Sequence, residues 1–166
     1  DVSVRYCPPW SGGSSGSRIS QTTVSQAKAV TGRWEKDLAG HWRFYGSHGY
    51  ENEWAYIANP YADKSKGQED ASWFHFGNDG IMDIGWFTDT DGKLYYLNPV
   101  SDNTLGRMLT GWHWLRGQDG LRRCYYFEEK SNGFRGMLYR SANTPDGYTV
   151  GADGAWTVQG VAVTRE

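Results

Sequence analysis

The chain reads GWFTDTDGKLYYLN over residues 85–98 and continues to Gly106-Arg107-Met108. The Asp91-Gly92 dipeptide divides this stretch into two short segments that are rich in aromatic residues. Glycine adopts positive φ and aspartate visits it at low cost, so such dipeptides close tight turns between antiparallel strands. The stretch therefore predicts a β-hairpin that is followed by a glycine and a sulfur-bearing side chain.

The same order of residues occurs four times in the chain. Each copy places a Trp before a turn, then a run of aromatics, and the last three copies end on a Gly and a sulfur or aliphatic side chain. The copies are Trp34…Trp42-Arg43-Phe44, Trp54…Trp73-Phe74-His75-Phe76…Gly80-Ile81-Met82, Trp86…Leu94-Tyr95-Tyr96-Leu97…Gly106-Arg107-Met108, and Trp112…Cys124-Tyr125-Tyr126-Phe127…Gly136-Met137-Leu138. An isolated hairpin is only marginally stable in water, so each copy must bury a face on its neighbour. The repeat predicts an all-β fold, a β-hairpin solenoid.

Composition shifts divide the chain into three parts. Residues 1–31 form an N-terminal segment whose Ser/Gly-rich stretch at residues 11–17 predicts a flexible linker. Residues 32–140 hold the four hairpin repeats. Residues 141–166 predict a C-terminal cap with one last hairpin around residues 151–154, where Asp153-Gly154 supplies the turn.

Charge and motifs exclude several classes of function. The net charge is −2 and the basic residues are scattered, so the basic face that nucleic-acid binding needs is missing. No apolar run approaches the roughly 20 residues that membrane insertion requires. The sequence has no Gly-x-Ser-x-Gly elbow, no His-Glu-x-x-His motif and no phosphate-binding loop. We therefore expect a protein that is not an enzyme and that needs no metal or other cofactor.

The repeats resemble a known pattern. The run from Gly85-Trp86 through Leu94-Tyr95-Tyr96-Leu97 to Gly106-Arg107-Met108 and Gly111-Trp112 is similar to the Gly-Trp…Trp-Tyr-Tyr…Gly-x-Met order of choline-binding and related cell-wall-binding repeats of Gram-positive bacteria. The resemblance covers about residues 32–140, and the cap resembles the C-terminal ends of such proteins. It implies a secreted, cell wall-associated module that holds a protein on choline-bearing teichoic or lipoteichoic acid.

The resemblance also implies which rings would hold the ligand. A quaternary ammonium donates no hydrogen bond, so proteins surround it with aromatic faces. The family's cage takes the Trp of Gly-Trp and the first aromatic of the run from one hairpin, and another aromatic from the next. The complete set is Trp54, Trp73 and Tyr96, with Met82 or Met108 as an apolar floor. A second set is Trp34, Trp42 and His75. Two further sets are degenerate. One keeps Trp86 and Tyr126, but Leu94 replaces the first aromatic. The other keeps Trp112, with Cys124 in place of the first aromatic and with Tyr148 or Trp156 as a candidate third wall.

Other interpretations of the same rings stay open. Rings that recur in every hairpin also fill the stack between units, and we expect this of Phe44, Phe74, Tyr95, Tyr125 and Phe127. A carbohydrate-binding module resembling glucan-binding and clostridial toxin repeats is an alternative, with polar fringes at Asn52, Asn78, Asn98, Asp83 and Lys93. An array that only forms a homodimer or spaces another domain is a third alternative.

The remaining polar residues predict no chemistry. Cys7 and Cys124 can pair in a secreted protein, but the position of Cys124 in its repeat favours a buried small hydrophobe. We expect His41, His48 and His113 to be solvated. Four carboxylates are expected in turns or on exposed edges, namely Glu51, Glu53, Glu128 and Glu129.

Overall fold

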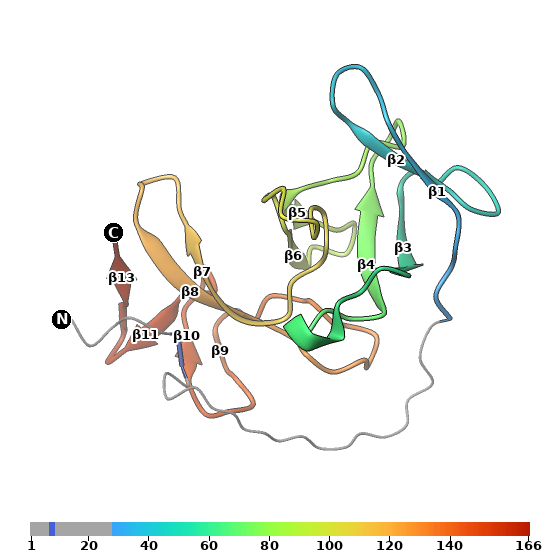
Figure 1. Cartoon of the computed structure of the whole chain (residues 1–166). Coiled ribbons are helices and arrows are strands. Elements are labelled where there is room, and N and C mark those ends of the chain that lie inside the picture. Colours follow the sequence, from blue (N-terminus) through green and yellow to red (C-terminus); the bar gives the residue numbers. More distant parts are fainter. Residues whose placement is uncertain (1–6, 9–27) are drawn as a thin grey trace. The chain divides into compact units, whose positions relative to one another are not determined.

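The structure is a computed structural model that describes residues 7–8 and 28–166 (Figure 1). The predicted Ser/Gly-rich linker at residues 11–17 lies outside the described residues. The described chain divides into two compact units, which we call the N-terminal unit (residues 28–109) and the C-terminal unit (residues 110–166 with residues 7 and 8). This division falls between the third and fourth repeats.

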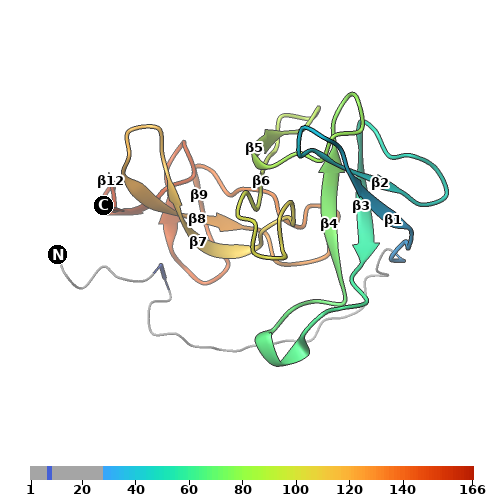
Figure 2. The same ribbon diagram turned by 45° about the horizontal axis from the view of Figure 1, so that its top comes forward.

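The N-terminal unit consists of three antiparallel hairpins in succession (Figure 1). They pair β1 (Arg33–Lys36) with β2 (Trp42–Tyr45), β3 (Glu53–Ala58) with β4 (Ala71–Phe76), and β5 (Gly85–Thr88) with β6 (Leu94–Leu97). The connection from β3 to β4 is longer than the others and carries the 3-10 helix η1 (Lys64–Lys66), visible beyond the ends of those strands in Figure 2. The prediction of an all-β chain of successive hairpins is confirmed, whereas the continuous solenoid stays a prediction.

A bridge back to the hairpin follows β4, β6 and β8 at the predicted sulfur or aliphatic position. Phe76 pairs with Met82, Leu97 with Met108, and Phe127 with Leu138. Phe76, Leu97 and Phe127 are each fully buried. The repeated glycine before the bridge is required by close approach, since a Cβ on Gly106 would lie 2.4 Å from Met82 Sδ at a φ of +87°.

Aromatic side chains fill the core of the N-terminal unit. Its buried members are Phe44, Tyr50, Ala55, Ile57, Phe74, Phe76 and Met82. Residues one strand position apart point to opposite faces, so Phe74 and Phe76 enter this core while Trp73 and His75 lie on the other face of β4. The expected core residues Phe44, Phe74, Tyr95, Tyr125 and Phe127 are all buried, which confirms that interpretation.

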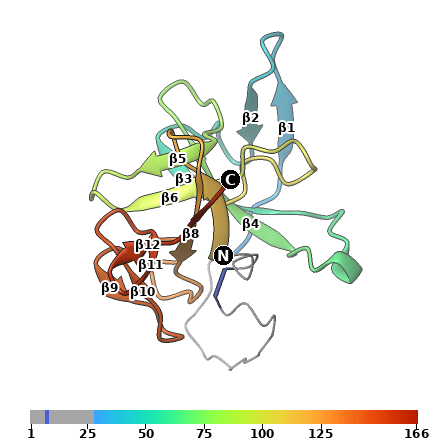
Figure 3. The ribbon, with the colours of Figure 1, turned by 90° about the vertical axis from the view of Figure 1, so that its left-hand side faces the viewer.

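The C-terminal unit holds two sheets. In one, β8 (Arg122–Phe127) lies between β7 (Gly111–Arg116) and β13 (Thr164–Arg165). The other has the order β12-β11-β10-β9, built from β9 (Ala142–Asn143), β10 (Thr149–Val150), β11 (Trp156–Val158) and β12 (Val161–Ala162), and is visible at the C-terminal end of the chain in Figure 3. The cap is thus more than the single hairpin expected, because Gln159-Gly160 makes a further turn with positive φ at both residues.

The two cysteines form a disulfide. Cys7 and Cys124 are bonded, with their Cα atoms 5.6 Å apart and a sequence separation of 117. The interpretation of Cys124 as an unpaired hydrophobe is therefore wrong, although its side chain is fully buried as expected, and Pro8 beside Cys7 is buried too. The repeat position explains the burial, but pairing depends on Cys7, which lies outside the repeats. No helix in the described part of the chain is long and apolar enough to cross a membrane.

Candidate functional site

Three rings of the C-terminal unit lie around Trp112, and we call the four rings together the Trp112 cluster: Trp112, Tyr126, Tyr148 and Trp156. Trp112 on β7 is paired across the hairpin with Tyr126 on β8, and their ring centroids are 5.2 Å apart. Gly111 precedes Trp112 with a φ of +78°, and a Cβ there would lie 2.8 Å from Glu129 Oε2. The Gly-Trp dipeptide of the repeat is therefore a backbone requirement of this hairpin.

The ring planes of three members of the cluster lie at large angles to one another. The Trp112 centroid is 6.1 Å from that of Tyr148 and 6.5 Å from that of Trp156, and the last two are also 6.5 Å apart. The interplanar angles are 86°, 67° and 90° in the same order. Rings at these spacings and angles are not stacked face to face, and all three are partly exposed.

A tight turn positions two of these rings. The Thr144 backbone N–H donates to Tyr148 O at 2.7 Å, and the Tyr148 N–H donates to Thr144 Oγ1 at 3.1 Å. The Thr144 hydroxyl, which is 4% exposed, donates to Asp146 Oδ1. Asp146 Oδ2 in turn accepts a hydrogen bond of 3.0 Å from Trp112 Nε1. The turn before β10 therefore holds Tyr148 and the Trp112 indole in one hydrogen-bonded arrangement.

Carboxylates surround the cluster. Tyr126 Oη donates to Glu129 Oε1 at 3.3 Å, and Tyr139 Oη donates to Glu128 Oε1 at 2.7 Å, with Tyr139 itself packed on Tyr126 at 5.1 Å. The pKa of Tyr126 is raised, first by burial and then by the negative charges of Glu129, Glu128 and Asp146. Burial is the largest cause of this shift, and the three carboxylates add to it in the same direction.

Glu128 corrects one expectation from the sequence. Its side chain is 6% exposed, so it does not lie on an exposed edge as predicted. Its Oε2 atom accepts the backbone N–H groups of Glu129 and Lys130, at 3.0 and 3.1 Å, and these bonds with the Tyr139 hydroxyl compensate its burial. Glu129 is exposed as expected.

Some rings of the described chain have a basic side chain over them, and the rings of the Trp112 cluster are among those that do not. Elsewhere Arg165 lies over Trp114 at 4.7 Å from the centroid, and Lys36 lies over Trp42 at 5.7 Å. Within the residues that the structure describes, no Lys or Arg is placed over Trp112, Tyr148 or Trp156. The preference of these ring faces for positive charge is therefore not met inside the described chain.

The most complete predicted set is arranged differently from expectation. Trp54 packs on His75, Phe87 and Tyr95, with centroids 5.0, 5.6 and 4.9 Å away. Tyr96 lies on the opposite face of β6, against Trp86 at 5.0 Å, because neighbouring residues of a strand alternate. Trp73 packs on Tyr56 at 5.1 Å. The ring that meets Trp54 is therefore Tyr95 rather than Tyr96.

The two predicted methionine floors also separate. Met82 is 7% exposed and belongs to the core of the N-terminal unit, so it is packing rather than the floor of an open site. Met108 is half-buried, and its N–H donates to Trp73 O at 2.9 Å. The prediction that Met108 contacts a ligand beside Trp73 stays a prediction.

The structure does not bring the second predicted set together. Trp34 packs into the core on Phe74 and Phe76, at 5.1 and 5.9 Å, with Trp42 at 6.3 Å. His75 lies on the other face of β4, where its Nδ1 atom is 2.7 Å from Asp83 Oδ2 and its ring is 4.0 Å from Phe87. Trp34 pairs across its hairpin with Phe44, as Trp54 pairs with His75. Each Trp also packs on a ring of the next hairpin, Trp34 on Phe74 and Trp54 on Tyr95.

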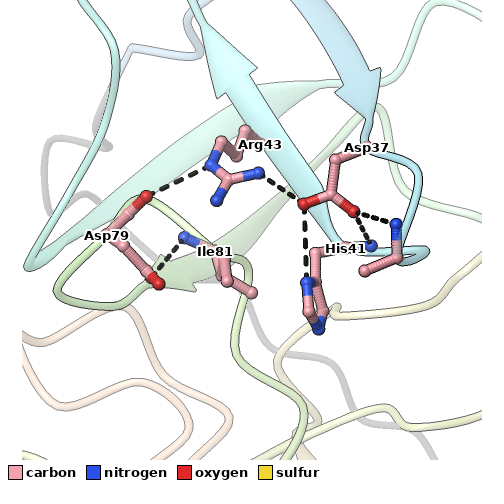
Figure 4. A network of polar contacts seen from close by, with 6 residues as sticks. Asp37, His41, Arg43, Asp79 and Ile81 are labelled. Atoms are coloured by element: carbon pink, nitrogen blue, oxygen red, sulfur yellow. Dashed lines mark hydrogen bonds and ion pairs between the residues drawn. The ribbon is translucent and has the colours of Figure 1, made fainter.

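Arg43 fills the position of the first hairpin that Phe74 has in the second, and it has a structural role (Figure 4). Its Nη1 atom donates to Asp37 Oδ2 at 2.7 Å and its Nε atom to Asp79 O at 3.1 Å, which joins the β1–β2 turn to the turn after β4. The hydrogen bond from Arg43, with one from the His41 backbone, lowers the pKa of Asp37 to about 2. The first repeat therefore has an ion pair at the position where the second repeat has a buried ring.

The degenerate sets have separate outcomes. Trp86 is 41% exposed and lies in the N-terminal unit, whereas Tyr126 lies in the C-terminal unit, so their joint site stays a prediction. Trp112 has both candidate walls, Tyr148 and Trp156, beside it. His113 is half-buried rather than solvated, its Nε2 atom is 2.7 Å from Thr110 O, and burial lowers its pKa.

Sequence reasoning missed the carboxylates that bind the indoles. Trp54 Nε1 donates to Asp89 Oδ2 at 2.9 Å, as Trp112 Nε1 does to Asp146 Oδ2. The sequence does carry a signal for these contacts, since each aspartate lies in the turn of the hairpin that follows the one with its Trp. From the sequence alone, a turn aspartate predicts the turn itself and not a partner far along the chain. Among the described residues, no group of three or more His, Cys, Asp or Glu is placed to hold a metal ion.

Comparison with known proteins gives similarity at the level of structure. No protein-family model matches the chain, and no curated protein matches it. Solved structures that match include CbpF in complex with ipratropium (28% identity, 75% of this chain and 38% of the other, TM-score 0.40). Another is a truncated alternansucrase from Leuconostoc mesenteroides (18% identity, 76% and 10%, TM-score 0.50). A third is the pneumococcal cell wall endolysin from phage Cp-1 complexed with choline (19% identity, 87% and 42%, TM-score 0.29).

These matches bear on the fold. The alternansucrase match shows a shared fold alone. The chain is similar to choline-binding proteins, as the repeat pattern predicted. The chain spans less than half the length of each of the three proteins named above.

Proposed function

We propose that this chain is a non-catalytic cell-wall-binding module that binds choline-bearing teichoic or lipoteichoic acid through the Trp112 cluster. The observation that carries the proposal is the set of three steep rings, Trp112, Tyr148 and Trp156, with Asp146 and Glu129 beside them. Aromatic faces attract a cation that cannot donate hydrogen bonds, and nearby carboxylates strengthen the preference for positive charge. The resemblance of the repeats supports a secreted protein held at the cell wall.

The expected affinity is modest. Each ring contributes about 0.5–1 kcal/mol at an exposed site and about 2 kcal/mol when desolvated. Three partly exposed rings therefore supply about 3–4 kcal/mol, which corresponds to a Kd on the order of 1 mM. A polymer that carries many choline groups compensates for such weakness, because several modules or sites bind one chain at a high effective concentration.

The polar residues considered for sugar recognition are already bonded within the chain. Asn52 Nδ2 donates to Asn78 Oδ1 at 3.1 Å, and Asp83 is paired with His75. Asn98 Nδ2 donates to Thr104 Oγ1 at 2.6 Å and to Asp102 Oδ1 at 3.2 Å. Binding a glycan through these groups would require those bonds to be exchanged, which favours the choline proposal over the carbohydrate alternative.

The test is calorimetric titration of the full chain with four ligands: choline, tetramethylammonium, the uncharged choline isostere 3,3-dimethyl-1-butanol, and dextran. We expect saturable millimolar binding of the two cations, weaker binding of the isostere and none of dextran. Trp156→Ala removes one wall and should weaken choline binding about tenfold or more. Phe134→Ala, which removes an exposed ring of the same unit outside the cluster, is the matched control and should bind as the parent does.

Two results would decide against the proposal. Binding of dextran without binding of either cation would assign the chain to the carbohydrate-binding class. Choline binding that is equal in Trp156→Ala and in the parent would place the ligand elsewhere than in the Trp112 cluster.

A further inference from the structure

We propose that Asp146 determines the selectivity of the Trp112 cluster for a cation over a neutral ligand of the same shape. It would do so in two ways, by fixing the orientation of the Trp112 indole and by placing a negative charge at the rim of the rings. The inference rests on the proposed function for its ligand, but the fixing of the indole can be tested without any ligand.

The contacts of Asp146 support the first of these roles. One carboxylate oxygen, Oδ2, accepts the indole N–H of Trp112 at 3.0 Å, and the other, Oδ1, accepts the hydroxyl of Thr144. Thr144 is almost fully buried, and its Oγ1 also accepts the backbone N–H of Tyr148. The carboxylate therefore connects two walls of the cluster, Trp112 and Tyr148, through a buried hydroxyl. An indole without this bond could turn about its side-chain torsions and lose its angle to the other rings.

The same bond occurs in the N-terminal unit, where the outcome is different. Trp54 Nε1 donates to Asp89 Oδ2 at 2.9 Å, over a sequence separation of 35 residues against 34 for Trp112 and Asp146. There, however, His75 packs on both Trp54 and Phe87, and the rings are closer together than in the Trp112 cluster. An indole held by a turn carboxylate is thus a recurrent feature of these hairpins. At Asp146 it occurs beside rings that have no cation over them in the described chain.

The charge of Asp146 supports the second role. Both of its oxygens accept neutral donors, and among the described residues no basic side chain forms an ion pair with it. The same charge is one of the smaller contributions to the raised pKa of Tyr126, after burial, Glu129 and Glu128. A unit charge about 6 Å from a bound cation, in largely aqueous surroundings, changes affinity about 3- to 10-fold, and added salt screens this effect. A neutral isostere would not experience it.

The experiment compares Asp146→Asn and Asp146→Ala with the parent. Asn keeps an oxygen that can accept the indole N–H but removes the charge, whereas Ala removes both. Each protein is titrated with tetramethylammonium and with 3,3-dimethyl-1-butanol at low and high NaCl. The hydrogen exchange of the Trp112 Nε1–H is followed by NMR without ligand. Asp153→Asn is the matched control, because it removes the same charge from another Asp-Gly turn of the unit, one whose carboxylate accepts a backbone N–H rather than an indole.

We expect Asp146→Asn to bind tetramethylammonium 3- to 10-fold more weakly, to lose most of the salt dependence, and to bind the neutral isostere as the parent does. Asp146→Ala should also lose protection of the Trp112 Nε1–H and bind both ligands more weakly. Asp153→Asn should resemble the parent in every measurement. Near-UV circular dichroism of each variant identifies any general loss of packing.

Several outcomes would overturn the inference. Unchanged cation affinity in Asp146→Asn would remove the role of the charge, and unchanged Nε1–H exchange in Asp146→Ala would remove the role in positioning. If the parent binds neither cation, the proposed function fails and selectivity fails with it. In that case, loss of Nε1–H protection in Asp146→Ala would still support the positioning of Trp112.

Discussion

The disulfide between Cys7 and Cys124 should provide much of the stability of the C-terminal unit. It closes a loop with a sequence separation of 117 residues, and the chain-entropy model assigns about 4.9 kcal/mol to a loop of that length. The dependence on length is logarithmic, so a loop of only about 35 residues would still give about 3.8 kcal/mol. Small single domains are commonly stable by about 5–15 kcal/mol in total. Breaking this bond should therefore remove a large fraction of the unit's free energy of unfolding.

The variant is Cys7→Ala, because Cys7 is half-buried whereas Cys124 is fully buried and its removal would also leave a cavity. Guanidinium unfolding, followed by Trp fluorescence, should give a free energy of unfolding about 4–5 kcal/mol below that of the oxidised parent. The reductant TCEP should produce the same loss in the parent and none in Cys7→Ala. A difference below about 1 kcal/mol, or two reactive thiols in the unfolded but unreduced parent, would refute this reasoning.

Three further predictions concern the N-terminal unit. Gly106→Ala combines a positive φ with a Cβ 2.4 Å from the buried Met82 Sδ, so the free energy of unfolding, measured by urea denaturation, should fall by about 2–3 kcal/mol. A loss below about 1 kcal/mol would show that Met82 moves aside freely. Trp54→Ala removes ring contacts with His75, Phe87 and Tyr95 and should lower the free energy of unfolding by about 3 kcal/mol, while choline binding measured by calorimetry stays at the parental value. Loss of choline binding in a folded Trp54→Ala protein would instead place Trp54 in the ligand site. The Asp37 carboxyl should titrate near pH 2 by NMR, and its pKa should move toward 3.8 in Arg43→Met because the hydrogen bond from Arg43 is lost; an unchanged midpoint would contradict that bond. Since the folded pKa is lowered, the contribution of Asp37 to stability is present above about pH 3.8 and is lost as the pH falls through 2.

Much of the fold was predictable because hairpin turns carry a local signal. Asp91-Gly92 and Asp119-Gly120 close the β5–β6 and β7–β8 hairpins, with φ values of +85° and +81° at the two glycines. The features that sequence missed depend on partners far along the chain. β13 forms because β8 has an edge to pair with, and the disulfide forms because folding brings Cys7 to Cys124. Neither partner can be recognised from the residues around it.

The candidate site was less predictable because it depends on strand parity. Tyr95 and Tyr96 are chemically identical neighbours, yet one meets Trp54 and the other meets Trp86. A one-residue difference in register exchanges the faces of a strand, and composition does not determine which face is buried. In the first hairpin Trp34 is partly buried against the core of the unit. Tyr148 and Trp156 were named as walls on the order of the cap alone, and the structure does place both beside Trp112.

The hairpins of Trp54 and Trp112 differ at the position across from the Trp. The residue across from Trp54 is His75, whose small ring is bonded to Asp83 and packs on Phe87, so it fills the space next to the indole. The residue across from Trp112 is Tyr126, whose longer side chain donates to Glu129 and packs on Tyr139. In both hairpins a carboxylate binds the polar atom of this residue and thereby sets where its ring lies. The two hairpins therefore differ in one cross-strand pair and its carboxylate, while the Trp and its own aspartate are common to both, and we propose that this pair is what leaves Trp112 accessible to a ligand.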